Sequence, residues 1–434
     1  MRVGVIGAGW AGMAAAVQLQ QQGHQVTVLE AARTLGGRAR ALTVEGSDGT
    51  PWTLDNGQHI LIGAYRQTLA LMHAVGVQAD QALLRLPLAL IYADGTGLKL
   101  PDLPPPWDAL VGVVRAKGWS PAEKCSLLLT CARWQLQGFR CASHLTVGQL
   151  CASLPTRLLQ EFIDPLCVSA LNTPAHASSA QVFLTVLRDS LFSGRGGSNL
   201  LIPRTDLGSL LPDAAARWLQ LQGAEVVMGE RVHHLDRADQ GGWLIGPRHF
   251  DAVVLATHSA EAARLAHDLA EHTSLPDERT ALARWADTAQ ALQHTAIGTV
   301  YAYTSTSGHT LPQPMVALRP GLHQPAQFVF DRGQLAGPRG LLAFVVSASE
   351  ADRAVLEEQV IQQARDQLGL TQFTPLKTVV EKRATFACTP GLNRPPNVLA
   401  PGLCAAGDYT EGPYPATLEG AVMSGQKAAT LLCQ

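Results

Sequence analysis

Three glycines near the start of the chain have the spacing of a phosphate-binding loop: Gly7, Gly9 and Gly12. An apolar segment, residues 2–6, precedes them, and a segment of helical composition, residues 13–22, follows them. Gly7 permits a tight turn, Gly9 lets the backbone approach a pyrophosphate, and Gly12 allows a helix to pack closely on a strand. The pattern predicts a βαβ unit that binds a dinucleotide; the alternative is a glycine-rich turn in an ordinary βαβ unit.

An acidic residue follows at the distance that ribose recognition requires. Residues 25–29 have the composition of a second strand, which ends at Glu30. A carboxylate at this position can accept hydrogen bonds from both ribose hydroxyls and repels a 2′-phosphate. The first N–H groups of the intervening helix, at Trp10 and Ala11, attract phosphate. We also expect Ala31, which follows Glu30, to border the same site. The whole arrangement predicts an adenine dinucleotide.

A double glycine followed by arginine, Gly36-Gly37-Arg38, stands where an NAD-binding domain would normally continue into another helix. Gly36 and Gly37 let the backbone pass close to a cofactor, and Arg38 can pair with a pyrophosphate oxygen. Considered alone, Arg38 is more typical of a solvated side chain. The motif resembles the second signature of FAD proteins of the glutathione-reductase and amine-oxidase type.

The C-terminal region contains a matching pattern. A short apolar segment ends at Gly407-Asp408, and residues 418–432 predict a helix. This resembles the last FAD motif of the same superfamily, in which the aspartate bonds a ribityl hydroxyl or phosphate and the helix start, here Thr417 and Leu418, faces the flavin. The resemblance implies that the cofactor is FAD. It also implies contacts near the adenine and along the cofactor from Val232 and Thr257.

The composition is typical of an intracellular enzyme that handles an apolar compound. Charged residues make up 16% of the 434 residues and hydrophobic residues 47%, against roughly 25% charged residues in average soluble proteins. The net charge of −2 gives no electrostatic basis for binding nucleic acid. We expect no signal peptide, no membrane span, no metal site and eight reduced cysteines. The predicted location is cytoplasmic, free or on the inner membrane face.

The order of segments predicts an α/β protein with interleaved domains. A Rossmann-type FAD-binding domain would comprise residues 1–75, 196–261 and 391–434, and a mixed α+β substrate domain the rest. We expect a helical, substrate- or membrane-facing insertion at 76–195 and a strand-rich one at 262–390. The helices expected outside the N- and C-terminal motifs are 120–138, 146–162 and 207–222. The strands expected in the remaining segments are 224–228, 252–257, 298–303, 327–330 and 341–347.

Two further segments, residues 55–65 and 172–174, narrow the resemblance. Together with residues 407–417, they resemble the hydroxysqualene dehydroxylase family, formerly called squalene-associated FAD-dependent desaturases, within the amine-oxidase and phytoene-desaturase group. That resemblance implies reductive removal of the hydroxyl of hydroxysqualene, giving squalene for hopanoid synthesis. Gly57 and Gln58 would position the flavin ring. No second dinucleotide motif is present in the sequence for NADPH, so an external electron donor, of an identity the sequence does not reveal, would reduce the flavin.

Removing a hydroxyl requires a proton donor close to the flavin. His59 directly follows Gly57 and Gln58, the residues expected to position the flavin ring, and is the first candidate for the proton donor. Tyr414 and Glu411 follow the C-terminal aspartate, and Asp164 lies in the helical insertion. Each of these side chains is more often structural than catalytic, so the sequence leaves the acid open.

A hydrocarbon substrate requires an apolar site. Residues 125–131 and 183–187 are apolar on most sides and could line a tunnel, although helical core is the more common role of such segments. Residues 104–119 combine Trp107 and Trp119 with basic residues, a composition that suits peripheral contact with a membrane.

Three alternatives remain from the sequence. A carotenoid or phytoene-type desaturase or isomerase would use the same fold and a similar apolar tunnel. An amine oxidase would usually have a tyrosine of its aromatic cage at the position of Thr417, which argues against amine chemistry. A non-catalytic isoprenoid-binding flavoprotein would hold FAD without redox turnover.

Overall fold

The computed structural model describes residues 1–46, 49–192, 194–304 and 311–434. A six-stranded sheet in the order β10-β2-β1-β14-β21-β20 forms the cofactor domain. Its first five strands are parallel, and β20 is antiparallel to β21. The bounds are β1 Arg2–Ile6, β2 Gln25–Glu30, β10 Glu225–Met228, β14 Ala252–Leu255, β20 Val398–Ala400 and β21 Leu403–Ala405. The predicted α/β fold is confirmed.

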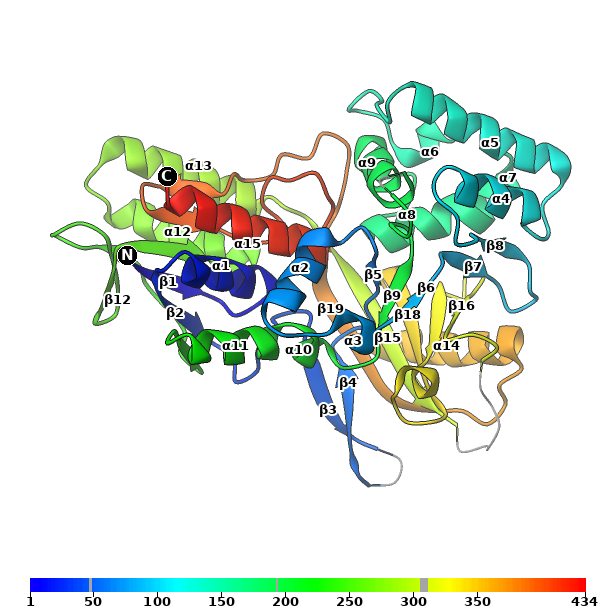
Figure 1. Ribbon diagram of the computed structural model, residues 1–434, viewed down its shortest axis with the longest axis horizontal. Coiled ribbons are helices and arrows are strands. Elements are labelled where there is room, and N and C mark those ends of the chain that lie inside the picture. Colours follow the sequence, from blue (N-terminus) through cyan, green and yellow to red (C-terminus); the bar gives the residue numbers. More distant parts are fainter. Residues whose placement is uncertain (47–48, 193, 305–310) are drawn as a thin grey trace.

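Helices cover both faces of this sheet because buried side chains alternate along its strands. On one face Val3, Val5 and Val254 belong to a core that includes α1, α11 and α15. On the other face Val253 and Leu255 pack in a core that includes α12 and α13. These helices are α1 Trp10–Gln21, α11 Pro212–Leu221, α12 Ser259–His272, α13 Pro276–Gln290 and α15 Leu418–Leu432. Both chain ends lie in this part of the molecule (Figure 1).

The hairpin of α12 and α13 moves one expected domain boundary. Most of it falls within residues 262–390, which were expected to form the strand-rich insertion. In the structure the indole N–H of Trp285 on α13 donates to the carbonyl oxygen of Pro396 beside β20, at 2.7 Å. Both helices lie on the face of the cofactor sheet opposite α15. The strand-rich region therefore begins after Gln290.

That region forms a five-stranded antiparallel sheet in the order β16-β17-β18-β15-β19. The bounds are β15 His294–Tyr303, β16 Met315–Ala317, β17 Phe328–Asp331, β18 Leu341–Ser349 and β19 Thr374–Phe386. Helix α14, Arg353–Leu368, packs on one face, where Leu356 and Val360 meet Phe344. The neighbouring residue Val345 points to the other face, toward the cavity described below.

The helical insertion forms a separate lobe, at the upper right in Figure 1. It contains α4 Trp107–Arg115, α5 Pro121–Leu136, α6 Val147–Leu150, α7 Thr156–Leu158, a π-helical turn Leu159–Ile163, α8 Asp164–Leu171 and α9 Ala180–Leu191. The expected helix 120–138 is present as α5, and Ser120 and Glu123 form its capping box. None of the helices in the described part of the chain is long and apolar enough to cross a membrane.

Two expected helices are interrupted, each next to a proline. The segment 146–162 divides into α6, α7 and the π-helical turn because Pro155 begins a new helix. The segment 207–222 divides into α10, Leu207–Leu210, and α11. Leu211 precedes Pro212 and, with a φ of −147° and a ψ of −56°, lies outside the helical region, so α10 ends before it.

Short elements connect these parts. They are α2 Arg66–Ala74, α3 Ala79–Ala82, a 3₁₀ turn Arg332–Leu335, and the strands β3 Ala41–Glu45, β4 Pro51–Asp55, β5 Leu61–Ile62, β6 Leu83–Leu86, β7 Ala89–Ile91, β8 Gly97–Lys99, β9 Leu200–Pro203, β11 Asp236–Arg237, β12 Trp243–Ile245 and β13 Arg248–Phe250. Strand β9 pairs with both β5 and β6, so the returning chain is attached to the start of the helical insertion.

Candidate functional site

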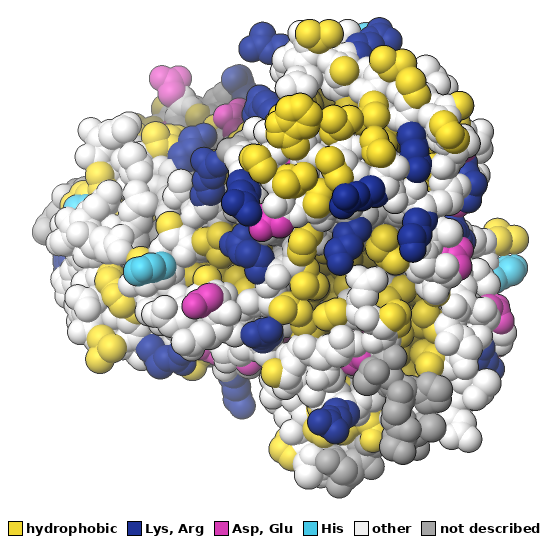
Figure 2. Space-filling view, turned by 45° about the vertical axis from the view of Figure 1, so that its right-hand side comes forward, with side chains coloured by type: hydrophobic (Ala, Val, Ile, Leu, Met, Phe, Trp, Pro, Cys, Tyr) yellow, Lys and Arg dark blue, Asp and Glu magenta, His cyan; other side chains and the backbone are white. Residues whose placement is uncertain are grey.

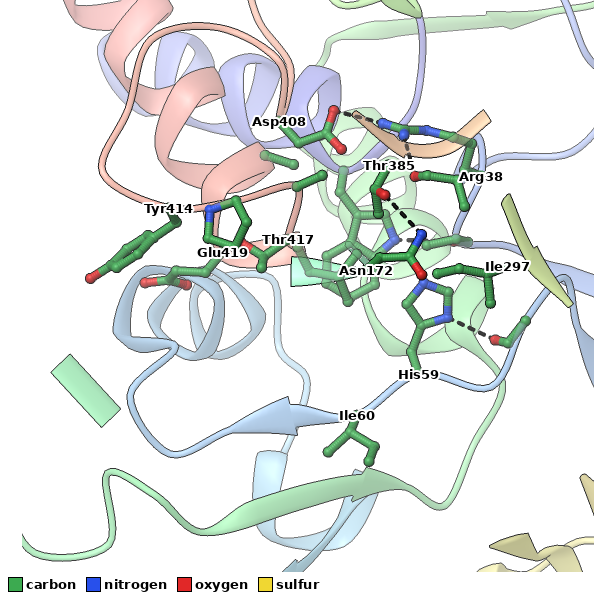
Figure 3. A pocket seen from close by; sticks show the side chains of 18 of the residues that line it. Arg38, His59, Ile60, Asn172, Ile297, Thr385, Asp408, Tyr414, Thr417 and Glu419 are labelled. Carbon is green, nitrogen blue, oxygen red and sulfur yellow. Dashed lines mark hydrogen bonds and ion pairs between the residues drawn. The ribbon is translucent and has the colours of Figure 1, made fainter. Parts of the chain in front are cut away.

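A cavity of about 720 Å³ lies where the three parts meet, and Figure 3 shows a portion of its wall. It brings together cofactor-binding candidates from both ends of the sequence. These are Gly7, Gly9, Trp10, Ala11, Glu30, Ala31, Gly37, Arg38, Gly57, Gln58, His59, Val232, Thr257, Gly407, Asp408, Thr417 and Leu418. Of the predicted cofactor residues, Gly12 is the one outside this wall.

The glycines of the first loop have different roles. A Cβ at Gly12 would lie 2.0 Å from the carbonyl oxygen of Gly7, and a Cβ at Gly7 would lie 2.6 Å from that of Ala256. Gly7 also has a φ of +107°. A Cβ at Gly9 would meet nothing within 4 Å. Gly12 and Gly7 are therefore required by the packing of the protein, whereas the free space at Gly9 belongs to the cavity.

The start of α1 and the Glu30 carboxylate face the same cavity. Gly9 is the N-cap of α1 and supplies no side chain to cap it, so the first N–H groups are available to an anion. The carboxylate of Glu30 accepts hydrogen bonds from the backbone N–H groups of Ala8 and Ala32, at 2.7 and 2.8 Å. These two bonds fix its orientation and leave lone pairs for the two ribose hydroxyls.

Arg38 joins the first and last motifs of the chain. Its guanidinium forms an ion pair with Asp408, with Nη2 at 2.6 Å from Oδ1, and donates to the carbonyl oxygen of Ala384 at 2.6 Å. Figure 3 shows the pair at the edge of the cavity. The buried Asp408 carboxylate orients the Arg38 guanidinium at the cavity wall, and a contact of Arg38 with pyrophosphate stays a prediction.

Two buried polar atoms in the cavity wall have no partner among the described residues, His258 Nε2 and Tyr409 Oη. His258 Nδ1 accepts a hydrogen bond from the N–H of Ala260, so the neutral ring carries its proton on Nε2. Burial, and then the charge of Arg38, lower the pKa of His258 to about 4. Unpaired buried donors are costly, and a polar cofactor such as FAD would satisfy both. Sequence reasoning missed His258, although it directly follows Thr257.

His59 does not have the state that a general acid requires. Its Nδ1 lies 2.7 Å from the carbonyl oxygen of Gly57, which can only accept, so Nδ1 carries the proton of the neutral ring. Burial lowers the pKa of His59 and outweighs the opposing effect of the Gly57 hydrogen bond. Its Nε2 is therefore a hydrogen-bond acceptor at neutral pH, which favours another residue as the acid.

The other acid candidates differ in whether they line the cavity. Tyr414 lines the cavity, and its hydroxyl donates to Asp189 Oδ2 at 3.1 Å. Burial and the nearby Asp189 carboxylate raise the pKa of Tyr414 to about 12. Glu411 and Asp164 are exposed and are not part of the cavity wall, so we do not retain them. Asp189 was missed because nothing in the sequence relates it to a residue 225 positions away.

The family-specific segment at 172–174 has a structural role. Asn172 ends α8 in the left-handed conformation, with a φ of +47°. Its Nδ2 donates to the hydroxyls of Thr295 and Thr385, both at 2.9 Å, and its Oδ1 accepts from the N–H of Ala348 at 2.7 Å. Asn172 thus connects the helical lobe to three strands of the second sheet beside the cavity (Figure 3).

A buried charge pair, Asp55 and Arg332, lies next to Gln58. Asp55 Oδ1 accepts from the N–H of Leu207 at 2.8 Å, and Asp55 Oδ2 is 4.0 Å from Nη2 of Arg332. Arg332 Nη1 donates to Oε1 of Gln58 at 3.1 Å. Burial raises the pKa of Asp55 to about 6, against the opposing effect of Arg332. Arg332 therefore holds Gln58 from outside the cavity.

The wall away from the cofactor motifs is largely apolar and comes from the helical lobe and the second sheet. Its apolar side chains are Leu88, Leu90, Leu98, Phe162, Leu166, Phe183, Val186, Leu187, Leu191, Met315, Phe328, Phe330 and Val345. The predicted apolar segment 183–187 contributes to this wall. The segment 125–131 does not, because it lies in α5, where its side chains enter the core or face solvent.

Known proteins resemble the chain over nearly its whole length. The hydroxysqualene dehydroxylase of Zymomonas mobilis is 27% identical, with 98% of each chain covered. That of Rhodopseudomonas palustris is 27% identical, with 99% of this chain and 98% of the relative covered. An oxidoreductase structure from Methanosarcina mazei has a TM-score of 0.73 at 17% identity, covering 99% and 100% of the two chains.

The family described as "Flavin containing amine oxidoreductase" matches residues 10–433. This range includes the α1 start, the Arg38–Asp408 pair and the α15 start, all of which meet at one cavity. The chain therefore belongs to the flavin containing amine oxidoreductase family and is an FAD-dependent oxidoreductase.

Proposed function

We propose that this enzyme removes the hydroxyl group of hydroxysqualene to give squalene, the precursor of hopanoids. The observation that carries the proposal is a single cavity that joins the FAD motifs to a broad apolar wall. A long hydrocarbon can be held by such a wall without polar contacts. The full-length similarity to hydroxysqualene dehydroxylases supports this choice among apolar substrates.

The reaction balances as an allylic alcohol plus a hydride and a proton, giving the hydrocarbon and water. Reduced FAD would supply the hydride, and a donor outside this chain would supply its two electrons. The protein would orient the alcohol, exclude water and deliver the proton to the departing oxygen. We assign that proton to the Tyr414 hydroxyl, whose pKa of about 12 lies below that of water. For this step the Tyr414 hydroxyl, which donates to Asp189 Oδ2 at 3.1 Å, would turn toward the departing oxygen, and solvent would then restore its proton.

An amine substrate fits the site less well. Thr417 occupies the position where amine oxidases usually place an aromatic residue of their cage. Here its hydroxyl caps α15 by accepting from the N–H of Gly420 at 3.0 Å. A threonine that caps a helix provides no aromatic face to a substrate nitrogen.

An anaerobic experiment tests the proposal. The protein is reduced with dithionite, mixed with hydroxysqualene in detergent and followed by its flavin absorbance, and the lipid is then extracted. We expect the flavin to reoxidise and one equivalent of squalene to form. A flavin that stays reduced contradicts the proposal. Oxidation of squalene or phytoene by the oxidised enzyme would instead support the desaturase alternative.

Tyr414→Phe should slow squalene formation by about 10²–10⁴-fold, the usual contribution of a general acid. FAD content should be unchanged. The matched control is His59→Gln, which removes a neutral ring that has no proton to give at Nε2 and should cost less than tenfold. Single-turnover rates of both variants measure the difference, and equal losses would remove the role given to Tyr414.

A further inference from the structure

The outer surface of the helical lobe is unusually apolar for a protein in water. Of the thirteen exposed large hydrophobic side chains in the described part of the chain, six lie between residues 103 and 136. They are Leu103, Trp107, Leu110, Val114, Leu129 and Leu136, and we name them the outer apolar face. Figure 2 shows hydrophobic side chains gathered over this lobe, with Lys and Arg between them.

Helix α4 exposes apolar side chains on its outer side, where a surface helix usually carries polar ones. Trp107, Leu110 and Val114 lie on one side at helical spacing, and their exposed fractions are 58%, 37% and 56%. Asp108, by contrast, is only 4% exposed, and burial raises its pKa. Val113 on the inner side is buried as well, so α4 is apolar on both sides, and its outer apolar residues suit an apolar surrounding.

The charges around this face are mainly positive. Between residues 103 and 140 the sequence has five basic side chains, Arg115, Lys117, Lys124, Arg133 and Arg140, and two acidic ones, Asp108 and Glu123. One of the two acids is buried, and the other is held in the capping box of α5. Exposed apolar residues bordered by basic residues complement a bilayer that contains anionic lipids.

The outer apolar face is also connected to the cavity. Helix α4 lies against β8 so closely that a Cβ at Gly112 would be 2.5 Å from Leu100. The side chain of Leu98, two residues earlier on β8, lines the cavity. Arg195, which follows α9, forms an ion pair at 3.0 Å with Asp102, in the segment that leads into α4. Helix α4, which carries Trp107, Leu110 and Val114 of the outer apolar face, is thus packed next to a strand whose Leu98 lines the cavity.

We propose that the outer apolar face docks on an anionic lipid bilayer, so that an apolar substrate passes from the membrane into the adjoining cavity. The supply of substrate in this inference rests on the proposed function, whereas the docking does not. Trp107 and Leu110 would enter the headgroup boundary, and Arg115 and Lys117 would contact lipid phosphates. The rest of the protein would remain in water.

The test is sedimentation of the FAD-loaded enzyme with vesicles of phosphatidylcholine containing 30% phosphatidylglycerol, roughly the anionic fraction at which surface charge supports peripheral binding. The triple variant Trp107→Ser/Leu110→Ser/Val114→Ser should lower the partition coefficient at least about tenfold. The control Leu221→Ser/Leu322→Ser removes side chains that are 83% and 91% exposed elsewhere and should bind as wild type. Arg115→Gln should reduce binding about fivefold on these vesicles and have no effect on pure phosphatidylcholine.

Dehydroxylation is measured in parallel with substrate in detergent and in vesicles. The triple variant should keep its detergent activity and lose activity on vesicles. Wild-type protein that does not sediment, or a triple variant that sediments as wild type, overturns the docking proposal. A dimer in light scattering that the triple variant dissociates would also overturn it, since a second copy would then cover the face.

Vesicle binding without dehydroxylation would leave the docking intact and contradict the proposed function. Retained FAD and a normal circular dichroism spectrum exclude unfolding of the variant, and Val114→Ser alone provides a milder form.

Discussion

Arg332→Met should destabilise the apoprotein by about 3–5 kcal/mol at pH 8, the usual result of removing one partner of a buried pair. Arg332 is 5% exposed and Asp55 is 1% exposed, so solvent cannot replace the lost partner. The second oxygen of the Asp55 carboxyl has no hydrogen-bond partner among the described residues. The variant therefore leaves a buried carboxylate that only the N–H of Leu207 stabilises.

The loss should depend on pH in a definite direction. Burial raises the pKa of Asp55 from 3.8 to about 6, so the folded state binds this proton more readily than the unfolded chain. The contribution of the group to stability is therefore complete below pH 3.8 and falls as the pH rises to about 6. Without Arg332 the pKa of Asp55 rises further. The difference between variant and wild type should consequently be small at pH 5, where the carboxyl is mostly protonated in both, and large at pH 8.

Urea unfolding at the two pH values measures this effect. The double variant Arg332→Met/Asp55→Asn should lose the pH dependence, because no ionisable group remains in the pair. Arg339→Met, an exposed arginine close to the same turn, should change stability by less than about 0.5 kcal/mol. An equal loss at pH 5 and pH 8 would mean that Arg332 acts through packing and not through the charge of Asp55.

The Asp55–Arg332 pair also illustrates what the sequence could not reveal. Gln58 and Arg332 are 274 positions apart, and neither has a neighbour in the sequence that suggests the other. Tyr414 and Asp189 are similarly separated, by 225 positions. Such pairs arise from the relative placement of two domains, which depends on the whole fold and not on local patterns.

Local patterns predicted much more of the cofactor domain. Strand β1 and helix α15 have the bounds read from the sequence, because their glycines, caps and apolar periodicity all lie within one element. The segment 146–162 shows the limit of the same reasoning. Its apolar composition indicated one helix, but Pro155 and the packing of the lobe divide it. The chemistry of His59 was also beyond sequence reasoning, since burial and the Gly57 carbonyl determine its proton.

The glycine loop allows the protein's own packing to be separated from binding of the cofactor. Gly12→Ala should destabilise the apoprotein by about 3 kcal/mol or more, because the new methyl would lie 2.0 Å from the backbone oxygen of Gly7. Gly9→Ala should change the stability of the apoprotein by less than about 1 kcal/mol. Gly9 has a φ of −75° and a ψ of −179°, which alanine adopts freely, and its Cβ would meet no atom of the protein within 4 Å.

The same Gly9→Ala variant should lose most of its affinity for FAD, because the methyl would occupy the space through which the pyrophosphate reaches the start of α1. Thermal unfolding with and without FAD measures this. In wild type, FAD at 100 times its dissociation constant should add about 2.7 kcal/mol of stability. For Gly9→Ala the addition should disappear at the same FAD concentration. If FAD still stabilises Gly9→Ala as it does wild type, the pyrophosphate lies elsewhere in the cavity, and the role of Gly9 read from its spacing is wrong.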